Sequence, residues 1–283
     1  MSVLRRVILV LLAGTLAVYL LILGLLYGAQ ESLMFPAPRV EVDRLSALAR
    51  RLGAEEVRVR TDDGVSLYAW HRVAPATRRR VVLYFHGNAE VVTSSEALQQ
   101  TLLEHGWDVF VMAYRGYPGS GGSPSEAGLT ADAQAAWRHL THGLNYEASQ
   151  IVIHGRSLGG GVAGTLMTQV QPAGLVLEST FTSAKDLTSE VYWMFPVRWL
   201  LRHPFETRLG AAKVRYPVHI FHGDADQVID VKHGRMLAGL FADATYREAE
   251  GWGHNDGLLP HDPSSRLAYL TFLERCSRAH QGQ

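Results

Sequence analysis

A serine between two glycines is the first feature of this sequence that could carry out chemistry. Residues 155–159 read Gly-Arg-Ser-Leu-Gly, which matches the pattern G-x-S-x-G. The motif follows an apolar run at 151–154 and leads into the small-residue stretch 160–164. This order predicts a strand, a tight turn and a helix, the context in which such a serine is exposed as a nucleophile. Glycine avoids clashes in the turn, and the helix N-terminus directs amides toward a developing anion.

A serine hydroxyl needs a base to take its proton and an acid to orient that base. Asp226 follows the apolar run 218–222, and His254 follows the run 245–249. With Ser157 they give the chain order Ser, Asp, His that is used with this type of turn. All three should meet at one edge of the sheet, where open α/β sheets build their sites. The sequence therefore predicts Ser157 as nucleophile, His254 as base and Asp226 as orienting acid.

Other readings of these residues are open. Asp224 lies close to Asp226, and Glu178 ends the sixth predicted strand, so either carboxylate is an alternative acid. His254 could instead be a buried core histidine, and Ser157 a serine that only forms the turn.

Backbone amides should bind the oxyanion that forms when a serine attacks a carbonyl. Leu158, directly after the nucleophile, is expected to supply one amide. Asn88, in the His-Gly-Asn sequence that follows the third predicted strand, is expected to supply the other.

Apolar, β-rich runs and helical patterns alternate along most of the chain, and Asp62-Asp63-Gly64 signals a hairpin between the first two runs. Continuous apolar strands separated by helices indicate an α/β fold with a mostly parallel sheet and helices on both faces. We expect one eight-stranded domain over 55–283. The strands are expected at 55–60, 65–73, 81–86, 108–114, 151–154, 174–178, 218–222 and 245–249, and the helices at about 91–104, 126–143, 158–170, 231–241 and 263–278.

An uncharged stretch precedes this domain. Residues 7–27 span ~30 Å as a helix, the thickness of the hydrocarbon core of a bilayer. The stretch is longer than the apolar region of a signal peptide, which favours an uncleaved transmembrane anchor over 1–30. A cleaved signal peptide and a buried core helix are the alternatives. Residues 31–54 are expected to be a connector.

The segment 181–213 interrupts the alternation and contains the apolar, aromatic stretch 191–201. It could be a helix packed on the edge of the sheet. It could also be a short lid over the site, because aromatic insertions after strands often line apolar pockets.

Composition excludes three classes of protein. The chain has 27 Lys+Arg and 27 Asp+Glu, so it lacks the basic excess with which nucleic-acid binders meet phosphates. Its single cysteine, Cys276, excludes a disulfide framework and a cysteine-rich zinc module.

Three motifs imitate other sites. The glycines at 159, 161 and 164 resemble a dinucleotide fingerprint, but that fingerprint starts directly at the strand end; close packing of helix and sheet explains them better. His86, His154 and His222 could cluster on a metal, but capping of strand ends is the better explanation, so no metal site is expected. The Gly-rich loop 116–124 lacks the lysine of a phosphate-binding loop.

Taken together, these motifs resemble the α/β-hydrolase superfamily, and more narrowly its membrane-anchored serine hydrolases, which include esterase-like proteins and protein depalmitoylases. The resemblance runs from about 81 to 256. The matching stretches are 85–89, 114–117, 123–126, 155–160, 178–181, 222–228 and 253–255. One departure is Ala113, where the family commonly has an aspartate before Tyr-Arg-Gly; it raises a question about loop geometry rather than about the triad.

The resemblance implies hydrolysis of carboxylic esters or thioesters through a Ser-His-Asp triad, with no cofactor. The expected partners are a small-molecule or lipid-like acyl ester and the membrane, with no nucleic acid and no obligatory protein partner. Two alternatives are a serine peptidase of the aminopeptidase type and a non-catalytic α/β-hydrolase scaffold that binds a ligand or partner.

The anchor also predicts the side of the membrane on which the domain lies. Arg5 and Arg6 precede the apolar stretch, and Glu31 is the first charge after it. Positive ends stay in the cytoplasm, so the catalytic domain should be exported, which disfavours cytosolic acyl-proteins as substrates. Alkaline phosphatase fused to the C-terminus should be active, and cytosolic fluorescence alone from a reporter at that position would contradict export.

Overall fold

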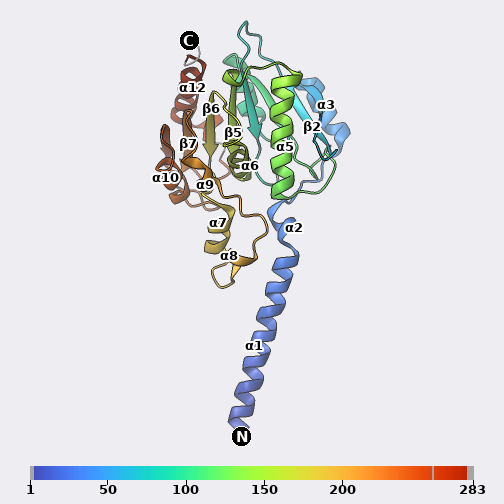
Figure 1. Ribbon diagram of the computed structural model, residues 1–283, viewed down its shortest axis with the longest axis vertical. Helices are drawn as coiled ribbons and strands as arrows, with labels where there is room; N and C mark the ends of the chain where they lie inside the picture. Colours follow the sequence, from blue (N-terminus) through green and yellow to red (C-terminus); the bar gives the residue numbers. More distant parts are fainter. Residues whose placement is uncertain (1–2, 257, 279–283) are drawn as a thin grey trace.

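The computed structural model describes residues 3–256 and 258–278 and contains one eight-stranded sheet (Figure 1). The strand order is β1-β2-β4-β3-β5-β6-β7-β8. β1 pairs antiparallel with β2, β2 pairs antiparallel with β4, and the remaining neighbours are parallel. The strands are β1 Glu55–Arg60, β2 Ser66–Arg72, β3 Val81–Phe85, β4 Asp108–Met112, β5 Ile151–Arg156, β6 Gly174–Glu178, β7 Val218–Gly223 and β8 Ala244–Ala249.

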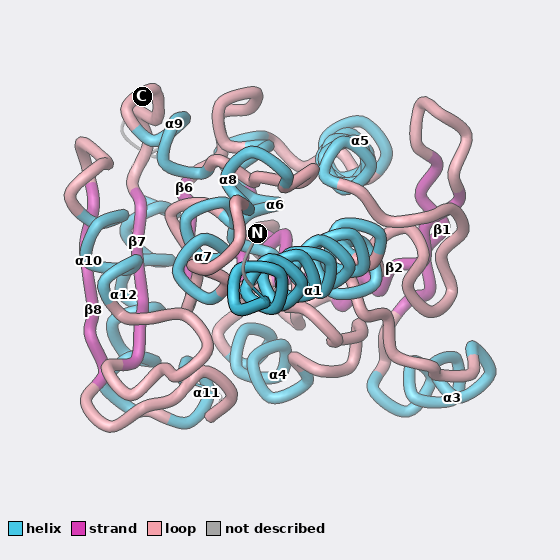
Figure 2. The backbone as a smooth tube through the Cα atoms, turned by 90° about the horizontal axis from the view of Figure 1, so that it is seen from below, coloured by secondary structure: helices cyan, strands magenta, loops and turns pink. Residues whose placement is uncertain are grey.

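Helices cover both faces of the sheet, as Figure 2 shows from below. α5, α6 and α9 pack side by side on one face, and α4, α11 and α12 lie on the other. Central strands such as β3 are therefore buried along their whole length, which explains their continuous apolar sequences. The helices of the domain are α3 Val42–Leu52, α4 Glu96–Glu104, α5 Glu126–Arg138, α6 Leu158–Leu166, α7 Ala184–Val191, α8 Val197–Leu200, α9 Thr207–Ala211, α10 Lys232–Ala238, α11 Leu258–His261 and α12 Pro263–Arg278.

The predicted strands and the α/β fold class are confirmed, and most differences lie at helix ends. α4 begins at Glu96 because 91–95 form turns instead of helix. α5 ends at Arg138 and continues as one π-helical turn, His139–Gly143.

The stretch 31–54 contains helix that the sequence analysis did not predict. In α3, Leu45 and Ala49 are buried one turn apart, while basic side chains occupy much of the remaining surface. Gly53 ends the helix in the left-handed conformation, with φ 64°. This part of the chain therefore packs on the domain as an amphipathic helix.

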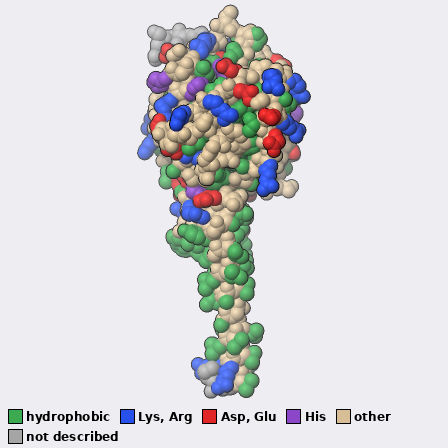
Figure 3. Space-filling model, turned by 90° about the vertical axis from the view of Figure 1, so that its right-hand side faces the viewer, with side chains coloured by type: hydrophobic (Ala, Val, Ile, Leu, Met, Phe, Trp, Pro, Cys, Tyr) green, Lys and Arg blue, Asp and Glu red, His purple; other side chains and the backbone are tan. Residues whose placement is uncertain are grey.

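The N-terminus forms α1 Val3–Gly28, a helix long and apolar enough to cross a membrane. Its most apolar 18-residue window has a mean hydropathy of 2.7, and none of that window is buried in the protein. Hydrophobic side chains line this stalk below the domain, with basic residues at its far end (Figure 3). α1 leads directly into α2 Gln30–Met34, which contacts the domain.

The segment 181–213, called the lid segment below, packs against the anchor. The Tyr19 hydroxyl donates to the Met194 carbonyl at 3.0 Å, and the Tyr19 and Phe195 rings stack at 5.2 Å. Nearer the domain, the Gln30 amide donates to the Leu200 carbonyl at 3.0 Å and accepts from the Arg202 amide at 3.0 Å. The α7–α8 part of the lid segment therefore lies beside the upper half of α1 (Figure 1).

Two tryptophans of this segment point away from the protein. Trp193 is 77% exposed and Trp199 is 84% exposed, close to a helix that is itself uncovered. Large apolar side chains grouped in this way mark a contact surface, and tryptophan is typical of the boundary between membrane and water. The lid segment therefore has the surface of a membrane-contacting element.

We expect the fluorescence of Trp193 and Trp199 to be quenched by phospholipids with brominated acyl chains when the full-length protein is in vesicles. A Trp193→Phe/Trp199→Phe variant should lose most of this quenching, because these rings reach the acyl chains. Trp137→Phe, which alters the far end of α5, is the matched control. Equal loss in both variants, or no quenching of the wild type, would show that the lid segment stays in water.

Candidate active site

The turn between β5 and α6 holds Ser157 in a strained backbone conformation. Ser157 has φ 51° and ψ −118°, values that cost a non-glycine residue about 1–3 kcal/mol. Hydrogen bonds hold it there: its amide donates to the Glu178 carbonyl at 2.9 Å, and the Thr180 hydroxyl donates to the Ser157 carbonyl at 2.7 Å. The end of β6 and the residues just after it therefore hold Ser157 in this conformation at the turn between β5 and α6.

The two glycines of the motif are required by close approach of backbone. A Cβ atom at Gly155 would collide with the carbonyl of Gly159, and one at Gly159 would collide with the carbonyl of Phe85. Any side chain at these positions would push α6 away from β3 and β5. The turn that exposes Ser157 can therefore form only with glycine on both sides.

The structure brings the three residues of the expected triad together. His254 Nε2 lies 3.0 Å from Ser157 Oγ, and His254 Nδ1 lies 2.7 Å from Asp226 Oδ2. Ser157 and Asp226 are 7% and 8% exposed. Ser157 follows β5, Asp226 follows β7 and His254 follows β8. Because these strands are parallel, all three residues lie at the same edge of the sheet. This geometry lets His254 accept the Ser157 proton while Asp226 orients the ring.

Asp226 is held as a carboxylate. Its Oδ1 accepts from the amides of Val228 and Ile229, each at 2.8 Å, and the His222 ring lies 3.4 Å from its Oδ2. Burial disfavours the charged form, but hydrogen bonds with His222, His254 and the Ile229 amide outweigh burial and keep the pKa of Asp226 well below its usual range. The acid therefore stays ionised at neutral pH.

The alternative acids are engaged elsewhere. Asp224 Oδ1 accepts from the Gly251 amide at 2.6 Å, which braces the loop that leads to His254. Glu178 is buried against His154 at 3.1 Å and Arg156 at 3.9 Å. The contacts of both carboxylates indicate structural roles.

Both residues expected to supply the oxyanion donors line the pocket that contains Ser157. Leu158 is the first residue of α6, so its amide has no carbonyl partner within the helix. Asn88 lines the same pocket, of about 320 Å³, as Ser157, Leu158 and His254. The Asn88 loop is held by Glu90, which accepts from the Gly87 amide at 2.8 Å.

Arg156 is a positioning residue that the sequence analysis missed. Its guanidinium forms ion pairs with Glu90 and Glu178 and donates to the His254 carbonyl at 2.5 Å. A single buried side chain thus ties the oxyanion loop, β6 and the histidine loop to the nucleophile turn. A signal was present in the sequence, because an arginine in a buried turn requires carboxylate partners.

The histidines considered as metal ligands have separate partners. His86 Nδ1 contacts the Gly87 carbonyl, and His154 contacts Glu178 and the Tyr269 hydroxyl. His222 Nε2 lies 2.8 Å from the Ile229 carbonyl, beside Asp226. These rings support the loops at the strand ends, and His222 also supports the acid of the triad, a role that the sequence pattern did not indicate.

The loop after β4 is positioned without the aspartate that Ala113 replaces. Arg115 forms ion pairs with Asp63 and Asp132, each at 2.8 Å. Ser120 closes the loop by donating to the Ala113 carbonyl at 2.7 Å. The buried arginine therefore gives this loop a fixed geometry beside the site.

The Ser157 pocket is lined in part by α2 and by the lid segment. Met34 of α2 and Leu187 and Thr188 of α7 line the pocket, opposite Val228 and Ile229. α7 thus covers the site, as the lid interpretation of 181–213 expects, whereas the edge-helix interpretation does not account for these contacts.

Comparison with known proteins identifies relatives of this chain. A family model described as serine aminopeptidase, S33, matches residues 76–210. Protein bem46 of Schizosaccharomyces pombe is 31% identical over 262 residues, which cover 87% of this chain and 87% of bem46. The α/β-hydrolase domain-containing protein WAV2 of Arabidopsis thaliana is 31% identical over 243 residues, covering 78% of this chain and 79% of WAV2.

A solved structure gives the same fold. The Pyrococcus furiosus esterase Pf2001 superimposes with a TM-score of 0.67 at 15% identity, covering 81% of this chain and 94% of the esterase. At this identity the match bears on the fold alone. Together with the two relatives, which align along most of their length, it shows that the chain belongs to the α/β-hydrolase family that includes bem46 and WAV2.

Proposed function

We propose that the protein is a membrane-anchored serine hydrolase that cleaves carboxylic ester or thioester bonds through an acyl-enzyme intermediate. The observation that carries this proposal is the continuous chain of hydrogen bonds from Asp226 through His254 to Ser157 on a strained turn. Strain of this kind persists only where the surrounding structure enforces it, and it gathers at active sites.

The reaction would begin when Ser157 Oγ attacks the carbonyl carbon of the substrate and His254 Nε2 takes the hydroxyl proton. The amides of Leu158 and Asn88 would stabilise the tetrahedral oxyanion, which collapses as His254 protonates the leaving group. Water activated by His254 would then attack the acyl-enzyme and release the acid. Asp226 would hold the ring in the tautomer that has its proton on Nδ1. These steps use only side chains and amides of the protein.

The domain organisation fits this proposal. Residues 1–30 would anchor the enzyme, 31–54 would connect, and 55–283 would form the catalytic domain on the exported side of the membrane. Its substrate would be a small-molecule or lipid-like acyl ester.

The family model's description makes a serine aminopeptidase the second candidate. Such an enzyme needs an acidic group to bind the charged amino terminus of a peptide. Among the described residues that line the Ser157 pocket, none is acidic, and Met34, Phe181, Leu187 and Val228 give it apolar walls. This lining favours an acyl group.

A fluorophosphonate probe should label the full-length protein in membranes, and Ser157→Ala should abolish that labelling, because the probe reacts with a serine that a base has activated. Ser149→Ala, in the turn before β5 at the opposite edge of the sheet, is the matched control and should label like the wild type. A folded wild type that does not label would refute the proposed enzyme and favour the scaffold.

Asp226→Asn should lower kcat for ester hydrolysis by about a thousandfold or more, because the amide favours the wrong histidine tautomer. Asp224→Asn, the matched control, should lower it by less than about tenfold, since it alters only a bracing contact. Because the pKa of Asp226 is lowered in the folded protein, the carboxylate stays charged at every pH above the ordinary pKa of an aspartate. Its stabilisation of the folded site is lost only at more acidic pH. The difference in kcat between Asp226→Asn and Asp224→Asn should therefore persist across roughly pH 5–8. Equal losses in the two variants would contradict the assignment.

A further inference from the structure

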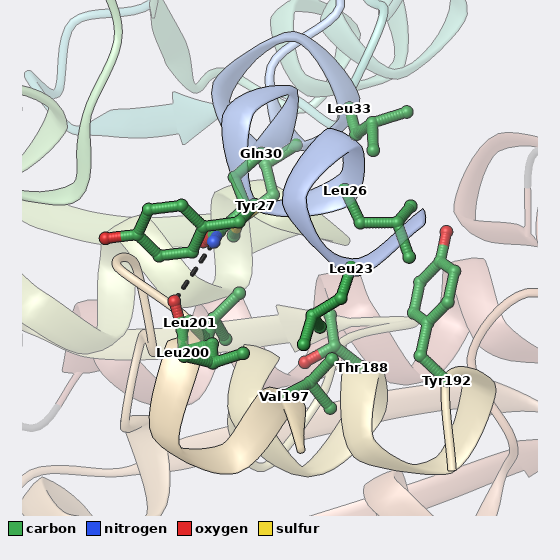
Figure 4. Close-up of a pocket in the computed structure, with 11 residues that line it drawn as sticks. Leu23, Leu26, Tyr27, Gln30, Leu33, Thr188, Tyr192, Val197, Leu200 and Leu201 are labelled. Atoms are coloured by element: carbon green, nitrogen blue, oxygen red, sulfur yellow. Dashed lines mark hydrogen bonds between the residues drawn. The ribbon is translucent and has the colours of Figure 1, made fainter. Parts of the chain in front are cut away.

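A second pocket lies between the anchor and the lid segment, and Figure 4 shows its walls. Leu23, Leu26 and Leu33 form one wall, from α1 and α2. Val197 and Leu200 form the other, from α8. We call this space, of about 140 Å³, the anchor–lid groove. Its lining is apolar apart from a few groups such as the Gln30 amide, and the lid backbone satisfies that amide at both its oxygen and its nitrogen.

The anchor–lid groove adjoins the candidate active site. Met34 of α2 and Thr188 of α7 line both the groove and the pocket that contains Ser157. The side chains of Met34 and Thr188 stand between the two spaces, so a small movement of these side chains would let an elongated apolar group reach from the groove to the Ser157 pocket. This adjacency relates the groove to the substrate of Ser157.

The lower part of the groove lies beside the part of α1 that is expected to cross the bilayer. Leu23 lies four residues before Tyr27, the end of the uncharged stretch, which corresponds to ~6 Å along a helix. The contact between Tyr19 and Met194 lies four residues deeper, at ~12 Å from the same point. A groove at this level opens beside acyl chains rather than beside water.

Several polar groups of the lid backbone are bonded within the protein, which favours such a position. An irregular loop in hydrocarbon must satisfy its own polar groups. The amides of Tyr192, Phe195 and Val197 donate within the segment, residue 196 is a proline without an amide hydrogen, and Tyr19 of the anchor donates to the Met194 carbonyl. The anchor thus supplies a hydrogen bond that water would supply to an ordinary loop.

We propose that the substrate is a long-chain acyl ester of a membrane lipid, and that its acyl chain enters from the leaflet through the anchor–lid groove. The anchor helix is then one wall of the substrate site as well as a tether. This inference rests on the proposed serine hydrolase activity. It adds the source of the substrate and the route by which its carbonyl reaches Ser157.

The experiment compares two esters with the full-length protein in phosphatidylcholine vesicles. One is 4-methylumbelliferyl palmitate dissolved in the bilayer, and the other is 4-methylumbelliferyl butyrate in water. Leu26→Trp fills the groove from the anchor side. It should lower palmitate hydrolysis by about tenfold or more, because a blocked groove leaves several methylenes without an apolar site. Butyrate hydrolysis and fluorophosphonate labelling should change by less than about twofold, because the Ser157 pocket is intact.

The matched control is Leu25→Trp, which places the same bulk on the neighbouring residue. Leu25 is 64% exposed, lies about 100° around α1 from Leu26 and is not among the described residues that line the groove. This control should leave both activities unchanged. Val197→Trp fills the groove from the lid side and should repeat the selective loss, which separates a blocked groove from a disturbed anchor. Retained labelling of each variant shows that the domain is folded.

Equal effects of Leu26→Trp on both esters, no effect on either, or the same loss with Leu25→Trp would overturn the groove as the entry route. Faster hydrolysis of a water-soluble S-palmitoylated peptide than of the vesicle-borne ester would overturn the lipid as the source. A wild type that hydrolyses neither ester and does not label would overturn the proposed function itself, and this inference with it.

Discussion

The position of every other group in the candidate site depends on the backbone strain at Ser157. The serine can adopt its strained conformation, with positive φ, only because Gly155 and Gly159 allow α6 to approach β3 and β5. The carbonyl of Glu178, at the end of β6, and the hydroxyl of Thr180, just after it, hold the serine there. Once the turn is fixed, the parallel order β5-β6-β7-β8 determines where a base and an acid can reach the hydroxyl. The loops after β7 and β8 are the ones in reach.

Electrostatics then make the loops of the site act as a unit. Arg156 and Glu90 are mostly shielded from water and Glu178 is buried, so removing one partner would leave a charge that water solvates poorly, and the contacts of Arg156 with both glutamates resist separation. The same guanidinium bonds to the backbone of His254, and the His222 ring lies against Asp226. The histidine is therefore held from both sides, by its backbone and by the acid that orients its ring. Such preorganisation avoids rearrangement of the protein during the reaction.

The sequence predicted the fold and the convergence of the triad well, because both follow from strand burial. A strand buried on both faces has an unbroken apolar sequence, and Ser157 and Asp226 follow two such strands, β5 and β7. His254 follows the edge strand β8, whose side chains are only partly buried. α3 was missed because its charged residues hide the short spacing of Leu45 and Ala49. An arginine in the turn before Ser157 indicates that carboxylate partners are needed, but which carboxylates it meets depends on side-chain direction across three loops, which no local pattern encodes. The hydrogen bond between Tyr19 and Met194 joins residues 175 positions apart, and nothing in the sequence around either residue indicates this contact.

An anchor that forms a wall of a groove also makes the groove sensitive to the bilayer. A transmembrane helix responds to a thicker or thinner hydrocarbon core by changing its tilt. α1 is attached to the lid segment near both Tyr19 and Gln30, so a change of tilt shears one wall of the groove against the other. Lipid composition would then set the width of the passage to Ser157. The same enzyme would work at different rates in membranes of different thickness, with no effector bound and no residue modified.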